Sequence, residues 1–221
     1  MDYSSLVDRL AVLDTCAVSD ALDSIGAGGA VSGLERRSTT ATIAGRVRTI
    51  RLAAGKPEGG SGSHLGTQTI VESSAIDVIV VEQRTGIEAA GWGGVLANAA
   101  RHKGIRGVIV EGPARDIDEY ERIGLPVFSR SATPRTARGR IHQAASNVEI
   151  RVGDVAVAPG DLVIADGTGV VFVPAGIAEK ALAIAEKIAA RERLMSADVL
   201  SDHPVTEVMG KDYETMLGTQ D

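Results

Sequence analysis

The segment Glu111-Gly-Pro-Ala-Arg-Asp116 places a guanidinium directly beside a carboxylate, on a loop that Gly112 and Pro113 shape. Carboxylate oxygens are the ligands that hard cations such as Mg²⁺ and Mn²⁺ prefer, so Asp116 can hold a divalent metal. Arg115 can then donate hydrogen bonds to the oxygen of a developing enolate. The pair is therefore a candidate for metal-assisted enolate chemistry. In the alternative interpretation, Asp116 caps the helix that follows and Arg115 pairs with a nearby acid.

A glycine-rich segment earlier in the chain is the second candidate. Ala90-Gly-Trp-Gly-Gly-Val-Leu-Ala97 has its glycines where an expected strand passes into an expected helix. The backbone N–H groups of a first helical turn have no partners within the helix, so they can bind an anion such as a carboxylate. The spacing of the glycines does not match the dinucleotide-binding fingerprint. Glycines that serve only a tight turn are the structural alternative.

Both candidates belong to a βαβαβ pattern, in which short apolar runs alternate with segments of helical spacing. Such alternation predicts parallel strands, with ligands in the crevice beyond their carboxyl ends. The loops that meet this condition are residues 90–94 and 111–116. Strands are expected at residues 78–81, 107–110 and 126–128, and helices at 93–102 and directly after Asp116.

The rest of the chain supplies elements on either side of this pattern. We expect the arginines of a strand at residues 42–53 to be solvated. Residues 55–63 read as a glycine-rich loop and 133–139 as a basic connection. Helices are expected at residues 6–13, 14–25, 64–74 and 174–194, and further strands at 148–152, 155–157, 162–164 and 170–173.

Composition limits the classes of function. A chain of 221 residues is long enough for one domain with a buried core, and we interpret it as one domain. The net charge of −6, with basic residues interleaved among acids, argues against a nucleic-acid partner. Cys16 is the only cysteine, which excludes an internal disulfide and fits the cytoplasm. We expect no membrane partner, because no run approaches the roughly 18 apolar residues of a membrane span.

The two candidate segments together, from Gly91-Trp-Gly-Gly-Val-Leu-Ala97 to Gly107-Val-Ile-Val-Glu-Gly-Pro-Ala-Arg-Asp116, resemble the RraA-like family. This family includes 4-hydroxy-4-methyl-2-oxoglutarate and 4-carboxy-4-hydroxy-2-oxoadipate aldolases and the regulator of ribonuclease activity A. Supporting motifs span most of the chain. They are Val18-Ser-Asp-Ala-Leu22, Gly124-Leu-Pro-Val-Phe128, Thr133-Pro-Arg135 and Pro159-Gly-Asp-Leu-Val-Ile-Ala-Asp-Gly-Thr-Gly-Val170.

The resemblance implies a fold and an assembly. We expect a single compact α/β domain of the swivelling β/β/α type with a C-terminal helix, over residues 1–200. Residues 201–221 would form a helical appendage. The resemblance also implies a homotrimer or hexamer with active sites between subunits.

The resemblance further assigns roles to the site. Arg115 and Asp116 would be catalytic: Asp116 would ligate the divalent metal, Mg²⁺ or Mn²⁺, and Arg115 would bind substrate oxygens and stabilise the enolate. The amides of Val95 and Leu96 would hold the pyruvyl carboxylate. The implied reaction cleaves a carbon–carbon bond of a small 2-oxo acid, such as 4-hydroxy-4-methyl-2-oxoglutarate or oxaloacetate, through a pyruvate enolate. The expected substrate-binding residues are Gly93, Gly94, Val95, Leu96 and Arg115.

One position departs from the family pattern. The aldolases of this family carry an acid where this chain has Gly94, and that acid supports the metal through its water shell. We expect weaker metal binding here, or replacement by Glu111 or by Glu192 of a neighbouring subunit. The departure also widens the range of oxo-acid or hydroxy-acid substrates to consider.

Other residues carry weaker signals. His64 follows the glycine loop and is either a substrate contact or solvated. Trp92 either forms a wall of the pocket or packs in the core. A structural contact is the default for Asp20, and Cys16 is expected to be inert in an apolar helical context. Arg135, Arg138 and Arg140 suggest either a subunit interface or a solvated loop.

Two other functions stay open from the sequence. One is a non-catalytic regulator that binds a ribonuclease, and the other is a lyase or hydratase that acts on a different oxo- or hydroxy-acid. A methyltransferase is not supported, because no cofactor-binding glycine motif with a ribose-binding acid is present.

Overall fold

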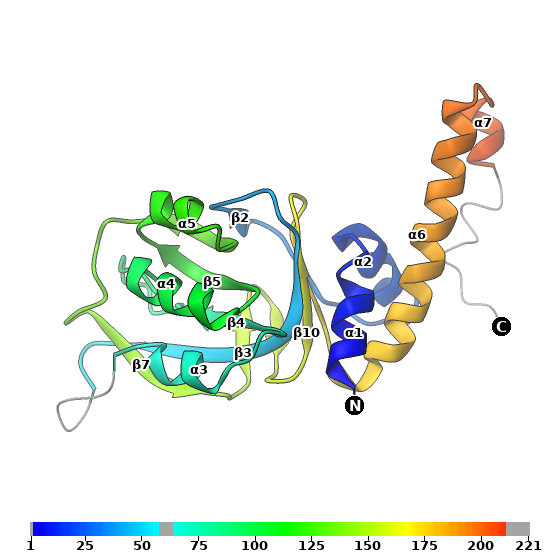
Figure 1. Cartoon of the computed structure of the whole chain (residues 1–221). Coiled ribbons are helices and arrows are strands. Elements are labelled where there is room, and N and C mark those ends of the chain that lie inside the picture. Colours follow the sequence, from blue (N-terminus) through cyan, green and yellow to red (C-terminus); the bar gives the residue numbers. More distant parts are fainter. Residues whose placement is uncertain (1, 58–63, 211–221) are drawn as a thin grey trace.

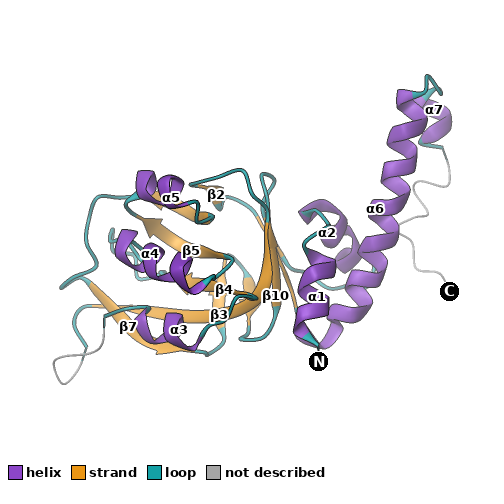
Figure 2. Ribbon diagram, viewed as in Figure 1, coloured by secondary structure: helices purple, strands orange, loops and turns teal. Residues whose placement is uncertain are grey.

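The computed structural model describes residues 2–57 and 64–210, and within these ranges nine strands form one curled sheet (Figures 1 and 2). The strand order is β1-β11-β10-β3-β4-β5-β6-β2, and β7 pairs with β3. The expected α/β fold with a C-terminal helix is confirmed. The strands of this sheet are β1 (Ala30–Val31), β2 (Glu35–Arg36), β3 (Ile43–Ala54), β4 (Asp77–Glu82), β5 (Gly107–Ala114), β6 (Val127–Ala132), β7 (Ile141–Ser146), β10 (Leu162–Ala165) and β11 (Val170–Val173).

The helices include the two that the βαβαβ pattern predicted. A 3₁₀ turn, Ala175–Ile177, precedes the last long helix. The helices are α1 (Tyr3–Leu10), α2 (Thr15–Asp23), α3 (Thr67–Glu72), α4 (Gly94–Lys103), α5 (Ile117–Ile123), α6 (Ala178–Leu200) and α7 (Val205–Val208). Parts of the predicted glycine loop and of the 201–221 appendage, residues 58–63 and 211–221, lie outside the described residues. The boundary at residue 200 stays a prediction.

Strands β3, β4, β5 and β6 pair in parallel, as the alternation predicted. Their buried residues are mostly aliphatic, because both faces of the strands are covered. Helices α3, α4 and α5 lie over one face (Figure 1). The hairpin of β8 (Ile150–Val152) and β9 (Val155–Val157) packs on the other. The carboxyl ends of β4 and β5 therefore meet at one edge, which brings the two candidate segments together. Residues 111–114, which were expected in a loop, belong to β5.

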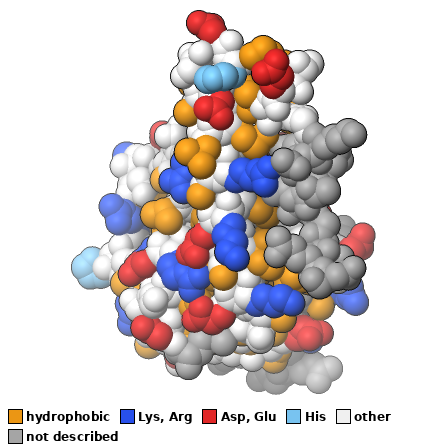
Figure 3. All heavy atoms as spheres, turned by 90° about the vertical axis from the view of Figure 1, so that its right-hand side faces the viewer, with side chains coloured by type: hydrophobic (Ala, Val, Ile, Leu, Met, Phe, Trp, Pro, Cys, Tyr) orange, Lys and Arg blue, Asp and Glu red, His pale blue; other side chains and the backbone are white. Residues whose placement is uncertain are grey.

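A second layer of helices packs against β10 and β11. Helices α1, α2 and α6 share one apolar cluster with these strands. Helix α6 is longer than expected: its last buried residue is Ile188, and beyond it the helix projects from the body (Figure 1). Leu194 and Leu200 are exposed there, and Figure 3 shows apolar side chains among charged ones along this side of the molecule. No described helix is both long and apolar enough to cross a membrane.

Several predictions of local structure were wrong. The pattern missed β7, because His142 and Gln143 give it no alternation and its register comes from pairing with β3. Helix α3 is shorter than the expected 64–74 helix, because Gly66 and Ser73 bound it. Cys16 lies in α2 as expected, but its side chain is exposed rather than in an apolar setting.

The arginines of β3 are not simply solvated. Arg46 Nε donates to Asp77 Oδ1 at 2.7 Å, and Arg48 Nε lies 3.4 Å from Asp77 Oδ2. The Asp77 side chain is fully buried and also accepts from Ser74 N at 2.7 Å. Burial by itself would raise the pKa of Asp77, but the hydrogen bonds from Arg46 and Ser74 outweigh it and hold this pKa below its usual value. The charged carboxylate thus joins the start of β4 to β3.

We predict that Asp77→Asn lowers the free energy of unfolding by about 2 kcal/mol at pH 7. The value is below that for a fully buried pair because the arginines are partly exposed. Since the folded-state pKa is depressed, this contribution is complete above the ordinary aspartate pKa, about 4, and is lost as pH falls through the lower folded value. Urea denaturation at pH 7 and near pH 3 measures it. The control is Glu82→Gln, whose partner Arg51 is more exposed; an equal loss in both variants would contradict the assignment.

Candidate active site

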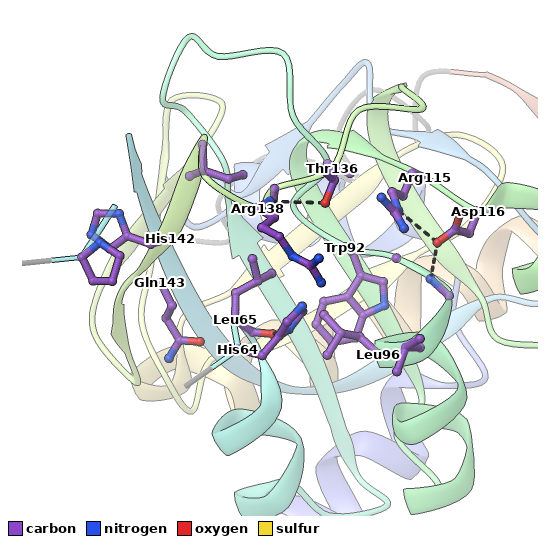
Figure 4. Close-up of a pocket in the computed structure, with 17 residues that line it drawn as sticks. His64, Leu65, Trp92, Leu96, Arg115, Asp116, Thr136, Arg138, His142 and Gln143 are labelled. Atoms are coloured by element: carbon purple, nitrogen blue, oxygen red, sulfur yellow. Dashed lines mark hydrogen bonds and ion pairs between the residues drawn. The ribbon is translucent and has the colours of Figure 1, made fainter. Parts of the chain in front are cut away.

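Asp116 is placed by an uncommon backbone conformation between β5 and α5. Its φ of 61° is left-handed, which few non-glycine residues adopt. The side chain does not cap α5, so the capping interpretation was wrong. Instead Asp116 Oδ2 accepts from Gly94 N, at the start of α4, at 2.8 Å. The carboxylate therefore joins the two candidate loops directly (Figure 4).

Arg115 turns toward the same helix start. Its Nε donates to Asp116 Oδ2 at 3.2 Å, so the acid with which it pairs is its own neighbour. The two terminal guanidinium nitrogens have no partner among the described residues, and the side chain is 37% exposed. They form a planar pair of donors that can bind carboxylate or oxo oxygens.

The amides at the start of α4 divide into used and unused donors. Gly94 N already binds Asp116, and Ala97 N binds Gly93 O. Val95 N and Leu96 N find no acceptor in the described part of the chain, as expected for the second and third residues of a helix. The unused amides are thus the two that the sequence analysis named, whereas Gly93 and Gly94 line the cavity with backbone alone.

A cavity of about 440 Å³ opens in front of these donors. Trp92 forms part of its lining, and its side chain is 1% exposed, with an indole Nε1 that is buried without a partner among the described residues. The Trp92 carbonyl accepts from Arg115 N at 3.1 Å and from the Tyr120 hydroxyl at 3.2 Å. Burial, reinforced by the charge of Asp116, raises the pKa of Tyr120, so it stays a neutral donor.

The far side of the cavity comes from His64, which the sequence analysis offered as a candidate substrate contact, and from the basic connection, which it did not assign to the site. His64 and Arg138 reach toward the Trp92 ring in Figure 4. Of the three arginines of the basic connection, Arg138 lines the cavity, whereas Arg135 pairs with Glu88 at 3.5 Å and Arg140 donates to Thr136 O. Nothing in the local sequence distinguishes Arg138 from Arg135 and Arg140. Its position at the cavity depends on where β7, the strand that follows it, pairs in the sheet.

Glu119 also lies beside Gly94 and Asp116, although the sequence analysis did not name it as a residue of the site. A Cβ placed on Gly94 would overlap Glu119 Oε2 and would lie 2.8 Å from Glu119 Cδ and 3.3 Å from Asp116 Cβ. Glu119 Oε1 accepts from Asn98 Nδ2 at 2.6 Å. The sequence does hold a signal: Glu119 follows Asp116 by three positions in the first turn of α5, which is the spacing of neighbours on a helix face.

Glu111 and Glu192 were expected to replace the acid that the family's aldolases carry at the position of Gly94, but both lie elsewhere. Glu111 Oε2 accepts from Arg130 Nε at 2.9 Å. Glu192 lies in α6 beside α2, where burial, and then the charges of Asp14 and Asp20, raise its pKa. Burial likewise raises the pKa of Asp20, which belongs to the helical layer and not to the cavity. Within one chain, neither Glu111 nor Glu192 approaches Asp116, and a role for Glu192 of a neighbouring subunit stays a prediction.

The fold and the site define an α/β protein in which a helix start with two free amides, a guanidinium and a carboxylate meet at the edge of a parallel sheet. The family model for RraA-like proteins, described as Aldolase/RraA, matches residues 15–172. The chain therefore belongs to the RraA-like family. The matched region contains every residue of the site.

Relatives and solved structures agree with this assignment. A "Putative 4-hydroxy-4-methyl-2-oxoglutarate aldolase" of Halalkalibacterium halodurans is 31% identical over 67% of this chain and 70% of its own length. Protein DlpA of Legionella pneumophila is 26% identical over 68% of this chain, which spans only 24% of DlpA. An uncharacterized Pseudomonas syringae protein has a TM-score of 0.84 at 27% identity, covering 94% of this chain and 98% of its own.

A fourth similarity concerns regulators. Streptomyces coelicolor RraAS2, described as an unusual member of the RNase ES inhibitor RraA protein family, has a TM-score of 0.77 at 25% identity. It covers 86% of this chain and 94% of its own. The family thus contains proteins named as aldolases and proteins named as regulators.

We predict that oxalate, a planar dianion of two carboxylates, changes the emission of Trp92 in a saturable way. Trp92 is the only tryptophan of the chain, and its ring lies in the cavity. Arg115→Ala is expected to weaken the apparent affinity about tenfold, because a charge-assisted hydrogen-bond pair is lost. Arg135→Ala, whose partner is outside the cavity, is the control. Equal affinity in the two variants would exclude Arg115 as an anion contact.

Proposed function

We propose that this protein is a divalent-metal-dependent lyase that cleaves a carbon–carbon bond of a small 2-oxo acid through a pyruvate enolate. One observation carries the proposal: the free nitrogens of Arg115, the free amides of Val95 and Leu96, and the carboxylate of Asp116 all border one cavity. Three such groups can bind a 2-oxo acid by its carboxylate and oxo oxygens. The aldolase names among the relatives point to the same reaction class.

The residues present fit a divalent cation with a partly retained water shell. Asp116 Oδ1 has no partner among the described residues, while Oδ2 is fixed by Gly94 N and Arg115. The described residues contain no group of three His, Cys, Asp or Glu side chains that would form a full protein cage. Mg²⁺ commonly binds through one or two carboxylates and several waters, so Mg²⁺ or Mn²⁺ suits this donor set. When bound, the cation would supply positive charge to the developing enolate.

The side chains would divide the work as follows. The amides of Val95 and Leu96 hold the substrate's carboxylate, and Arg115 donates to the oxo oxygen. In retro-aldol cleavage the C4 hydroxyl gives its proton to a solvent water and becomes a carbonyl, while the C3–C4 bond breaks and its electron pair passes to the enolate. A proton from solvent is then added at C3 to give pyruvate. Arg115 meets the negative charge that collects on the C2 oxygen. In oxaloacetate the same pair is left on C3 when CO₂ departs, so both reactions pass through the pyruvate enolate.

A second candidate function is a regulator that binds a ribonuclease without catalysis. The similarity to Streptomyces coelicolor RraAS2 favours it. A lyase or hydratase for another oxo- or hydroxy-acid is a third candidate. Assembly as a homotrimer or hexamer is part of the proposal in each case.

We predict release of pyruvate from 4-hydroxy-4-methyl-2-oxoglutarate or oxaloacetate in the presence of Mg²⁺ or Mn²⁺, and its loss on chelation. Coupling to lactate dehydrogenase measures the rate. Turnover on neither substrate, with metal present and the protein folded, would reject the pyruvate lyase and favour the other candidates.

We further predict that Arg115→Ala lowers kcat/KM by about 100-fold or more, the usual effect of removing a donor to a developing oxyanion. Asp116→Asn is expected to cause a comparable loss that excess Mn²⁺ partly restores. Circular dichroism verifies the fold, and Arg135→Ala is the control. Full activity in a folded Arg115→Ala variant would refute the mechanism.

A further inference from the structure

The start of α4 has to hold its geometry without side chains of its own. Gly93, the N-cap residue, is extended with a φ of −152° and a ψ of 176°, and it makes no side-chain cap bond. Gly94 follows it, and two successive glycines lose much conformational freedom when they are ordered. The free amides of Val95 and Leu96 can bind a carboxylate well only if this segment is fixed beforehand. The restraints must therefore come from outside the segment.

Two backbone groups receive these restraints. Gly94 N donates to Asp116 Oδ2 at 2.8 Å. The Trp92 carbonyl accepts from Arg115 N at 3.1 Å and from the Tyr120 hydroxyl at 3.2 Å. Because a peptide unit is planar, a fixed Trp92 carbonyl also fixes the direction of the Gly93 N–H group. The residue before the N-cap is thus tied both to the end of β5 and to α5.

Tyr120 brings a polar atom into an apolar part of the core. Its side chain is fully buried and belongs to the same apolar cluster as Trp92, Leu96 and Leu125. A buried hydroxyl costs free energy unless it is hydrogen-bonded, whereas a phenylalanine ring would fill the same space without this cost. The Trp92 carbonyl would still have Arg115 N as its donor, so the hydroxyl is not needed to satisfy it.

A general role in attaching α5 is the competing explanation for this hydroxyl. Helix α5 already has other polar links to α4. Asn98 Nδ2 donates to Glu119 Oε1 at 2.6 Å, and Arg101 Nε donates to Ile123 O at 3.1 Å. The Tyr120 hydroxyl differs from these links because it reaches the backbone directly before the two glycines.

We propose that Tyr120 is a positioning residue for anion binding at the start of α4. Its hydroxyl holds the Trp92 carbonyl, and through it Gly93 and the free amides of Val95 and Leu96, in the orientation that a carboxylate needs. Tyr120 acts through the backbone and contacts no substrate atom. The effect on the lyase rests on the proposed function, whereas the ordering of the helix start does not.

The first test measures amide hydrogen exchange in the full chain without ligand, by mass spectrometry of peptides that cover residues 92–97 and 107–114. Tyr120→Phe is expected to speed exchange in residues 92–97 about fivefold, the order of one neutral hydrogen bond, and to leave the β5 peptide unchanged. The matched control is Tyr3→Phe, which removes a hydroxyl from α1, where the ring packs against the Arg46 guanidinium at 5.0 Å. An equal increase in both peptides would indicate a loss of global stability only and would overturn the proposal.

The second test separates substrate binding from the chemical step. Amides that hold a carboxylate equally in the ground state and in the transition state affect KM and not kcat. Tyr120→Phe is therefore expected to raise KM for the pyruvate-releasing substrate, and the Kd of oxalate by calorimetry, about fivefold. We expect kcat of Tyr120→Phe, and both constants of Tyr3→Phe, to stay within about twofold of the unmodified chain.

The outcomes distinguish this inference from the proposed function. Unchanged exchange in residues 92–97 together with unchanged oxalate affinity in Tyr120→Phe would overturn the role of Tyr120 and leave the lyase intact. A lower kcat at constant KM would also contradict it, because the hydroxyl would then act in the chemical step. If the unmodified chain neither binds oxalate nor releases pyruvate, the proposed function fails, and hydrogen exchange alone decides whether Tyr120 orders the start of α4.

Discussion

The hydrogen bond from Gly94 N to Asp116 Oδ2 is the interaction on which the site depends. It joins the start of α4 to the end of β5 at 2.8 Å, across a sheet edge where two parallel strands end together. The bond can form only because Asp116 is in the left-handed region, which turns its side chain away from α5 and toward α4. The same bond uses one amide of α4 and leaves the next two for a ligand. The backbone strain at Asp116 is thus linked directly to the arrangement of free amides at the start of α4.

The features that the sequence predicted are those that local patterns encode. Alternating apolar strands and helices fixed the parallel order of β4, β5 and β6, and this order brings residues 90–94 and 111–116 to one edge. Arg115 could be named because it lies at a strand end that the local pattern marks. Val95 and Leu96 were named from the resemblance to the RraA-like family, which agreed with the helix start expected from the glycines. The resemblance to the RraA-like family added the expected reaction class, and the family model confirms the family.

The features that escaped prediction depend on contacts between distant segments. Strand β7 takes its register from β3, so Arg138 reaches the cavity by a route that no local pattern encodes. Glu119 was missed because its closeness to Gly94 becomes visible only when α4 and α5 are packed together. Arg46 was expected to be solvated, since its partner Asp77 belongs to the neighbouring strand.

The position of β3 at the centre of the sheet affects the order in which the chain can fold. Strand β3 pairs with β4, the next long strand in the chain, but its other edge is shared by β7 and β10, and β10 is made much later. The apolar faces of α1 and α2 pack mainly on β10, β11 and α6. During synthesis α1 and α2 leave the ribosome long before β10, β11 and α6, and they are therefore covered late. Their apolar faces stay exposed on the nascent chain until α6 is made, which gives a chaperone a surface to bind.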